Sequence, residues 1–188
     1  MADRSATEII RLTLLWASIL ALAAFSRPTV TSVAAGAVLL GVGESVRIWA
    51  AGHLFKTREL ITSGPYRRTR NPLYLGRLLI LTGLALMAWF SPLLNATLLC
   101  AGWLFFFGYY LPRKERIEPA RLQQLHGDAY VAYRETVPAL LPTAKPWPDN
   151  GVRWRLDRFI KNREHLTAAG LAAIVLVFAL RAAGAFAR

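Results

Sequence analysis

One cationic segment, Arg58 to Gly76, holds side chains suited to binding an anion and leads into an apolar run. Within it, Gly64-Pro65 predicts a turn. Asn71-Pro72 predicts a helix start, because asparagine is a favoured N-cap and proline fits the first helical position. Three arginines precede this start, and with the free backbone N–H groups there they would attract a carboxylate or a phosphate, or else only set membrane topology. These arginines are Arg67, Arg68 and Arg70.

The composition is that of a membrane protein. Of 188 residues, 55% are hydrophobic, and 23 Lys and Arg stand against 11 Asp and Glu, a balance unlike that of soluble domains. The apolar runs are too long for a soluble nucleic-acid-binding module, so the positive charge favours anionic lipid headgroups as partners and no nucleic acid. The one cysteine, Cys100, cannot form an internal disulfide. The three histidines lack metal-ligand spacing, so no metal site is expected.

Apolar runs of membrane-spanning length predict an all-α fold, a polytopic membrane helix bundle with about five transmembrane helices. We expect it to form a single membrane domain over residues 1–188. The expected spans are 9–25, 30–51, 73–90, 93–111 and 166–186. The turn at Ser91-Pro92 is short and uncharged, so the third and fourth spans should form a helical hairpin.

The connection 112–165 is polar and basic, and it predicts cytoplasmic amphipathic helices. Residues 118–133 show helical spacing, carried by Glu118, Leu122, Leu125, Ala129 and Tyr133. Four prolines make 137–148 irregular, and the basic and aromatic residues that follow predict an interfacial helix. Residues 52–72 and 112–165 carry five and eleven Lys and Arg, so the positive-inside rule places both on the cytoplasmic side.

Three ionisable residues fall inside the expected spans. Glu44 and Arg47 lie three residues apart on one helical face, and they form either a structural ion pair or the wall of a pocket. Arg77 either extends to the membrane surface or contacts an anion beside Tyr74. The run GVGES at 41–45 lacks the third glycine of a nucleotide fingerprint, so its glycines are interpreted as helix-packing residues.

Three stretches of the sequence together carry a family resemblance. They read RELITSGPY from Arg58, RNPLYLG from Arg70, and EPARLQQLHGDAYVAYRETVPALLP from Glu118 to Pro142. Over about 47–142 the chain resembles the isoprenylcysteine carboxyl methyltransferase and phospholipid N-methyltransferase family, small membrane enzymes that use S-adenosylmethionine. The expected helix at 166–186 lies outside the resemblance.

The resemblance implies S-adenosylmethionine as cofactor and assigns residues to its site. The implied cofactor-binding residues are Arg58, Glu59, Leu60, Ile61, Tyr66, Asn71, Pro72, Leu73, Tyr74 and Glu118. In physical terms, Glu118 could hold the ammonium group of the cofactor. Tyr66 and Tyr74 could contact its sulfonium through cation–π interactions. Lys114 and Arg77 are expected to bind the substrate.

The sequence departs from the family pattern at several of these positions. Arg58 and Asn71 stand where the family has histidines, and Pro119 replaces the second glutamate of an acidic pair. Lys114 stands where the prenylcysteine enzymes place an arginine for the carboxylate of the acceptor. A lysine does not reproduce that bidentate contact, which argues against a prenylcysteine acceptor.

These features predict an integral-membrane methyltransferase that acts on a lipid-like or small hydrophobic acceptor at oxygen, nitrogen or sulfur. No residue is an obvious general base, which favours an acceptor that is already nucleophilic. Two alternatives stay open: an NADPH-dependent membrane reductase related to sterol reductases, and a non-catalytic lipid-binding membrane protein. The expected location is a bacterial-type inner (plasma) membrane, with the active site on its cytoplasmic side.

Overall fold

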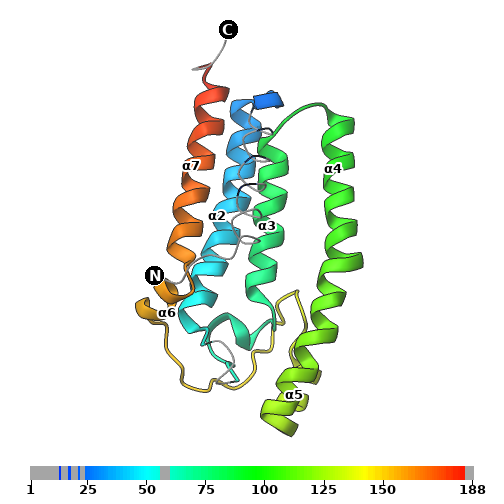
Figure 1. Ribbon diagram of the computed structural model, residues 1–188, viewed down its shortest axis with the longest axis vertical. Helices are drawn as coiled ribbons and strands as arrows, with labels where there is room; N and C mark the ends of the chain where they lie inside the picture. The colour runs from blue at the N-terminus through cyan, green and yellow to red at the C-terminus, as the bar shows by residue number, and fades with distance from the viewer. Residues whose placement is uncertain (1–12, 14–16, 18–20, 22–23, 56–59, 185–188) are drawn as a thin grey trace.

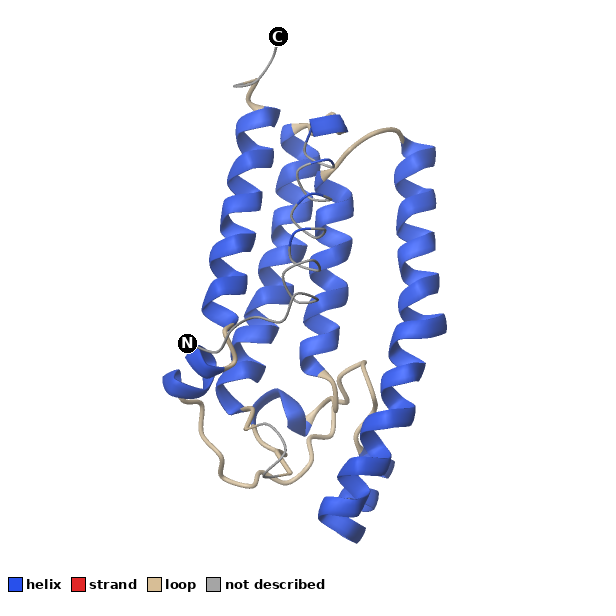
Figure 2. Cartoon of the chain, in the orientation of Figure 1, coloured by secondary structure: helices blue, strands red, loops and turns tan. Residues whose placement is uncertain are grey.

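The structure is a computed structural model that describes residues 13, 17, 21, 24–55 and 60–184. Over this part of the chain every regular element is helical, as Figure 2 shows, so the predicted all-α fold is confirmed. The elements are α2 (Val30–His53), the 3-10 turn η1 (Gly64–Arg67), α3 (Pro72–Met87), α4 (Pro92–Phe105), the π-helical turn η2 (Phe106–Tyr110), α5 (Leu111–Thr136), α6 (Leu156–Lys161) and α7 (Glu164–Ala182).

Helices α3 and α7 both pack along α2, and the three stand side by side in Figure 1. Their interior is an apolar core of buried side chains. It contains Val33 and Leu40 from α2, Ile80 and Met87 from α3, and Leu171, Ile174 and Phe178 from α7. The C-terminal helix α7 therefore completes the core, although the family resemblance in the sequence stops before it.

Glycines let α2 and α3 approach each other closely. A Cβ atom on Gly43 would lie 2.6 Å from the carbonyl oxygen of Gly76, and one on Gly83 would lie 2.6 Å from that of Gly36. Such backbone contact between membrane helices needs small residues. The predicted packing role is therefore right for Gly43. At Gly41, a Cβ atom would meet no atom within 4 Å among the described residues, so the packing role there stays a prediction.

The chain is a helical membrane protein. Three of the described helices are long and apolar enough to cross a membrane: α2, α7, and the continuous helix from Pro92 to Thr136. Helix α3 is apolar but has 16 residues, or about 24 Å, against a hydrocarbon core of roughly 30 Å. Most of the predicted first span, 9–25, lies outside the described residues.

Asn95 caps the end of α3, which stops at Met87, short of the predicted end at residue 90. The Asn95 side-chain amide donates to the carbonyl oxygens of Ala85, at 2.8 Å, and Ala88, at 3.2 Å. Its Oδ1 accepts from the N–H of Phe90 at 2.8 Å. These bonds satisfy backbone groups that a helix end leaves without partners. A side chain of the next helix thus decides where α3 ends.

The predicted break at residue 111 between a fourth span and a separate amphipathic helix is wrong. Helix α4 runs through η2 directly into α5, as Figure 1 shows. In η2 the N–H of Leu111 reaches back to the carbonyl of Phe106, a wide turn that precedes Pro112. Pro112 follows this wide turn directly, and the helix continues through it.

The predicted helix over 118–133 is interrupted at Gly127. Gly127 has φ 55° and ψ −137°, a conformation outside the helical region that favours glycine. The chain therefore turns at Gly127 and divides α5 into two parts. The second part brings Tyr130 and Tyr133 into buried positions.

Residues 138–155, called the strap below, cross the end of the bundle in irregular conformation, as the prolines predict. Three backbone hydrogen bonds of 2.8 to 2.9 Å join the strap to the turn before α3. They link Arg70 to Pro138, Arg68 to Thr143 and Arg67 to Trp147. The interfacial helix expected after the strap is limited to the six residues of α6.

The Gly83→Ala substitution should loosen the bundle. Its new methyl group would meet the backbone of α2, so we expect a loss of about 1 to 3 kcal/mol of stability, as for an overpacked core. Thermal unfolding in detergent measures the loss. The matched control is Gly102→Ala, whose Cβ would meet no atom within 4 Å in the part of the chain that the structure describes and should not lower the melting temperature. Equal melting temperatures for the two variants would contradict the close approach.

Candidate functional site

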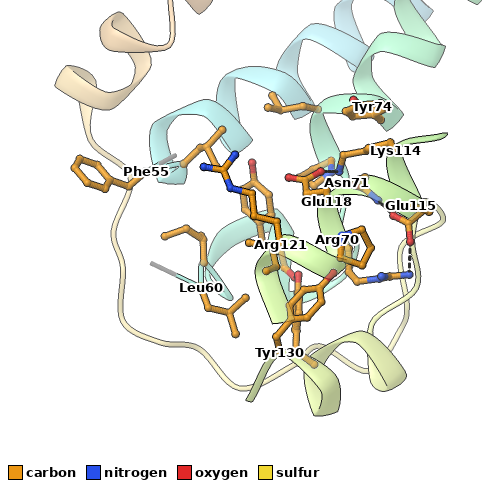
Figure 3. A pocket seen from close by; sticks show the side chains of 18 residues that line it. Phe55, Leu60, Arg70, Asn71, Tyr74, Lys114, Glu115, Glu118, Arg121 and Tyr130 are labelled. Atoms are coloured by element: carbon orange, nitrogen blue, oxygen red, sulfur yellow. Dashed lines mark hydrogen bonds and ion pairs between the residues drawn. The ribbon is translucent and has the colours of Figure 1, made fainter. Parts of the chain in front are cut away.

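A cavity opens where the end of α2, the start of α3 and both parts of α5 meet (Figure 3). Its volume is about 480 Å³, within the range of small-molecule pockets, roughly 300 to 1,000 Å³. Segments far apart in the sequence thus share one concave surface at the loop end of the bundle.

Glu115 joins the two sides of this cavity. Its Oε1 accepts from the side-chain amide of Asn71 at 2.7 Å, and its Oε2 lies 2.9 Å from the Arg70 guanidinium. The Asn71 amide also donates to the carbonyl oxygen of Ala139 at 2.8 Å. The helix start predicted at Asn71-Pro72 is confirmed, but the predicted capping role of the Asn71 side chain is wrong. The asparagine instead connects α5 and the strap to the start of α3.

Lys114 and Glu118 lie one turn apart on α5 and form an ion pair of 2.6 Å. The Lys114 ammonium also lies 4.6 Å from the centre of the Tyr74 ring, a cation–π contact. The Glu118 side chain keeps 47% of its surface exposed, and the pair occupies its Oε2. A second cationic group could therefore approach the same carboxylate from the cavity.

Tyrosines form much of the rest of the wall. The Tyr133 hydroxyl donates to the carbonyl oxygen of Tyr66 at 2.7 Å, and both side chains are buried. Burial raises the pKa of Tyr66 and of Tyr133 far above the usual range, so both stay protonated at neutral pH. Burial also raises the pKa of Tyr130, against the opposing charge of Arg70. These tyrosines can present ring faces and hydroxyl groups to a ligand, but none is a base near neutrality.

A buried ion pair between Arg47 and Glu164 supports Leu73 in the cavity wall. The Arg47 Nε donates to Glu164 at the start of α7 at 2.6 Å, and the Arg47 Nη1 donates to the carbonyl oxygen of Leu73 at 3.3 Å. Leu73 lines the cavity. Glu44 faces the same guanidinium at 3.6 Å, too far for a hydrogen bond. Of the two interpretations left open for Glu44 and Arg47, the ion pair is the one observed, and neither residue lines the cavity.

Most of the predicted site residues meet at this cavity. Leu60, Ile61, Tyr66, Asn71, Pro72, Leu73, Tyr74, Lys114 and Glu118 all line it. Arg58 and Glu59 lie outside the described residues. Arg77 does not line the cavity; its guanidinium packs against the Tyr74 and Tyr110 rings and donates to the Tyr110 hydroxyl.

Three residues near the cavity were not predicted from the sequence: Glu115, Arg121 and Glu164. Glu115 and Arg121 line the cavity, each three residues from Glu118 on α5. That helical spacing was a signal that could have found them. Glu164 had no such signal, because its partner Arg47 is far away in the sequence and only the fold brings them together.

The family comparison agrees with this geometry. The model of the phospholipid methyltransferase family matches residues 31–114, from the first turn of α2 to Lys114. The resemblance seen in the sequence is thus confirmed, and it implies a membrane methyltransferase. Comparisons with curated proteins and with solved structures found no match. The matched segment contributes the cavity wall from Leu54 to Tyr74 and Lys114, and α5 beyond Lys114 contributes the rest.

Removing the carboxylate that holds Arg47 should destabilise the protein. The Glu164→Leu substitution leaves the buried guanidinium with only the more distant Glu44, and breaking such a pair costs about 3 to 5 kcal/mol. Glu164→Gln should cost less, because its amide oxygen can still accept. Denaturant titration in detergent measures both, with the exposed Glu135→Leu as control. A Glu164→Leu variant as stable as that control would show that the pair does not hold α7 to the bundle.

Proposed function

We propose that the chain is an integral-membrane methyltransferase that binds S-adenosylmethionine in the cavity between α3 and α5. One observation carries the proposal. Two stretches that resemble the family's cofactor-binding motifs, around Tyr74 and around Glu118, line a single cavity although they are separated by the α3–α4 hairpin.

The groups that line the cavity fit this cofactor by their chemistry. S-adenosylmethionine carries a carboxylate, an ammonium, a sulfonium and an adenine. The Arg70 guanidinium lines the cavity, and its planar set of N–H donors suits the carboxylate. The Glu118 carboxylate suits the ammonium. The ring of Tyr74 already accepts a cation, Lys114, and suits the sulfonium.

When bound, the cofactor supplies an electrophilic methyl group on a positively charged sulfur. Its transfer is an in-line displacement that neutralises the sulfur and needs chiefly alignment and exclusion of water. The chain would supply both. Glu118 would hold the ammonium group of the cofactor and Arg70 its carboxylate, and the buried tyrosines would exclude water from the cavity wall. Since none of these tyrosines is a base near neutral pH, the acceptor atom must bring its own lone pair, as an amine, thiolate or carboxylate does.

The acceptor that fits best is a lipid-like or small hydrophobic molecule. Helix α4 stands apart from α2 and α7 in Figure 1, and its side chains are largely exposed, among them Leu104 and Phe105. An acceptor dissolved in the membrane could therefore reach the cavity beside α4, past Arg77 and Tyr110. The basic loops that surround the cavity favour the cytoplasmic side of a bacterial-type inner membrane for its opening.

Titration calorimetry on the purified full chain in detergent tests the proposal. We expect S-adenosylmethionine to bind with micromolar affinity. Glu118→Gln and Tyr74→Ala should each weaken binding at least tenfold, about 1.4 kcal/mol, because each removes a partner of a charged group. Circular dichroism should show both variants folded, and Glu135→Gln, the same change on an exposed site of α5, should bind as the unaltered protein does.

Other outcomes decide between the alternatives. Binding of NADPH in place of S-adenosylmethionine would indicate the reductase. Binding of neither would indicate a non-catalytic membrane protein. Binding of S-adenosylmethionine that both variants leave unchanged would place the cofactor elsewhere in the chain.

A further inference from the structure

A second cavity lies on the other side of the turn before α3. It occupies about 610 Å³ between the end of α2, η1 and the strap. Its lining includes Arg67, Arg68 and Arg153. The turn separates it from the first cavity, because Tyr66 and Arg70 line one and the two arginines between them line the other.

This second cavity is strongly basic. Three arginines line it against one carboxylate, Asp149, which lies 3.6 Å from Arg67. The Arg153 side chain is exposed and has no ion-pair or hydrogen-bond partner in the described part of the chain. The charge around the cavity is thus only partly balanced, and an anion would balance it.

The fold holds two of these guanidinium groups in place. The Arg67 Nε donates to the carbonyl oxygen of Trp147 at 2.8 Å. The Arg68 Nη1 donates to the carbonyl oxygens of Thr143, at 3.1 Å, and Ala144, at 3.2 Å. Each guanidinium has five N–H groups, so both retain donors for a ligand. Preorganised arginines of this kind suit phosphate oxygens better than mobile surface lysines do.

Two tryptophans place the cavity at the membrane surface. Trp49 is 46% exposed one turn before the end of α2, and Trp154 is 41% exposed on the strap. The Trp154 indole lies against Gly52, where a Cβ atom would meet it at 2.0 Å, and it donates to the carbonyl oxygen of Ile48 at 3.0 Å. Tryptophans gather where the acyl region of a bilayer meets the headgroups. A phosphate bound here would therefore belong to a lipid whose chains lie along α2.

We infer that the second cavity binds the phosphate headgroup of an anionic phospholipid. The arginines contact the phosphate, and Trp49 and Trp154 contact the glycerol and upper acyl region. The site is independent of the methyl-transfer cavity, so a lipid bound here is a resident partner and not the methyl acceptor.

The experiment is native mass spectrometry of the full chain released from mixed micelles of phosphatidylcholine and phosphatidylglycerol. We expect one phosphatidylglycerol to be retained in preference to phosphatidylcholine. Arg153→Gln should reduce that retention about fivefold, as loss of one basic group at a lipid surface does. Arg67→Gln is the second variant and should act alike. Arg116→Gln removes the same charge from an exposed site of α5 outside both cavities and should have no effect.

Each other result overturns the inference. Equal losses from Arg153→Gln and Arg116→Gln would mean a diffuse attraction of the basic surface for anions. Displacement of the lipid by millimolar glycerol phosphate would assign the cavity to a soluble phosphate compound. Retention of phosphatidylcholine and phosphatidylglycerol in proportion to the micelle would show that no anionic site exists. The control for misfolding is thermal unfolding: Arg153→Gln should melt at the same temperature as the unaltered protein.

Discussion

The carboxylate of Glu115 accepts from Asn71 and pairs with Arg70, and so it ties α5 to the first residues of α3. The donor cavity, the cavity between α3 and α5 proposed to bind the cofactor, depends on that link, because Glu118 is on α5 and Tyr74 is on α3. Other contacts act with it: the Tyr74 ring stacks on Tyr110 and lies beside Lys114, and the Tyr133 hydroxyl donates to the carbonyl oxygen of Tyr66. The strap strengthens the link, since its backbone is bonded to the same turn.

The turn between α2 and α3 serves two surfaces at once. Tyr66 and Arg70 line the donor cavity, while Arg67 and Arg68 between them line the basic cavity, the second cavity described above. The strap, which lines the basic cavity, also carries Trp147, whose ring contacts Tyr133 in the wall of the donor cavity. One short connection therefore positions side chains in both cavities.

Much of this arrangement could be predicted from sequence, because apolar run length and local turn chemistry act within a few residues. The start of α3 at Pro72 is of this kind. Tyr74 and Glu118 were expected in one site from the family resemblance and not from a local pattern, and both line the cavity. The end of α3 depends on Asn95, and the position of Leu73 in the cavity wall depends on the ion pair of Arg47 with Glu164. These are contacts between distant side chains, which no local pattern encodes. The reversal at Gly127 was missed because the helical spacing continues across it in the sequence.

We propose that one cavity, built from the start of α3 and from α5, holds the methyl donor. Ultraviolet cross-linking of radiolabelled S-adenosylmethionine to the full chain, followed by mapping of the labelled peptides, tests this proposal. We expect label on peptides that contain Tyr66 to Tyr74 and Lys114 to Leu122. Label confined to peptides of the basic cavity, around Trp49 and Trp154, or to α7 would contradict it.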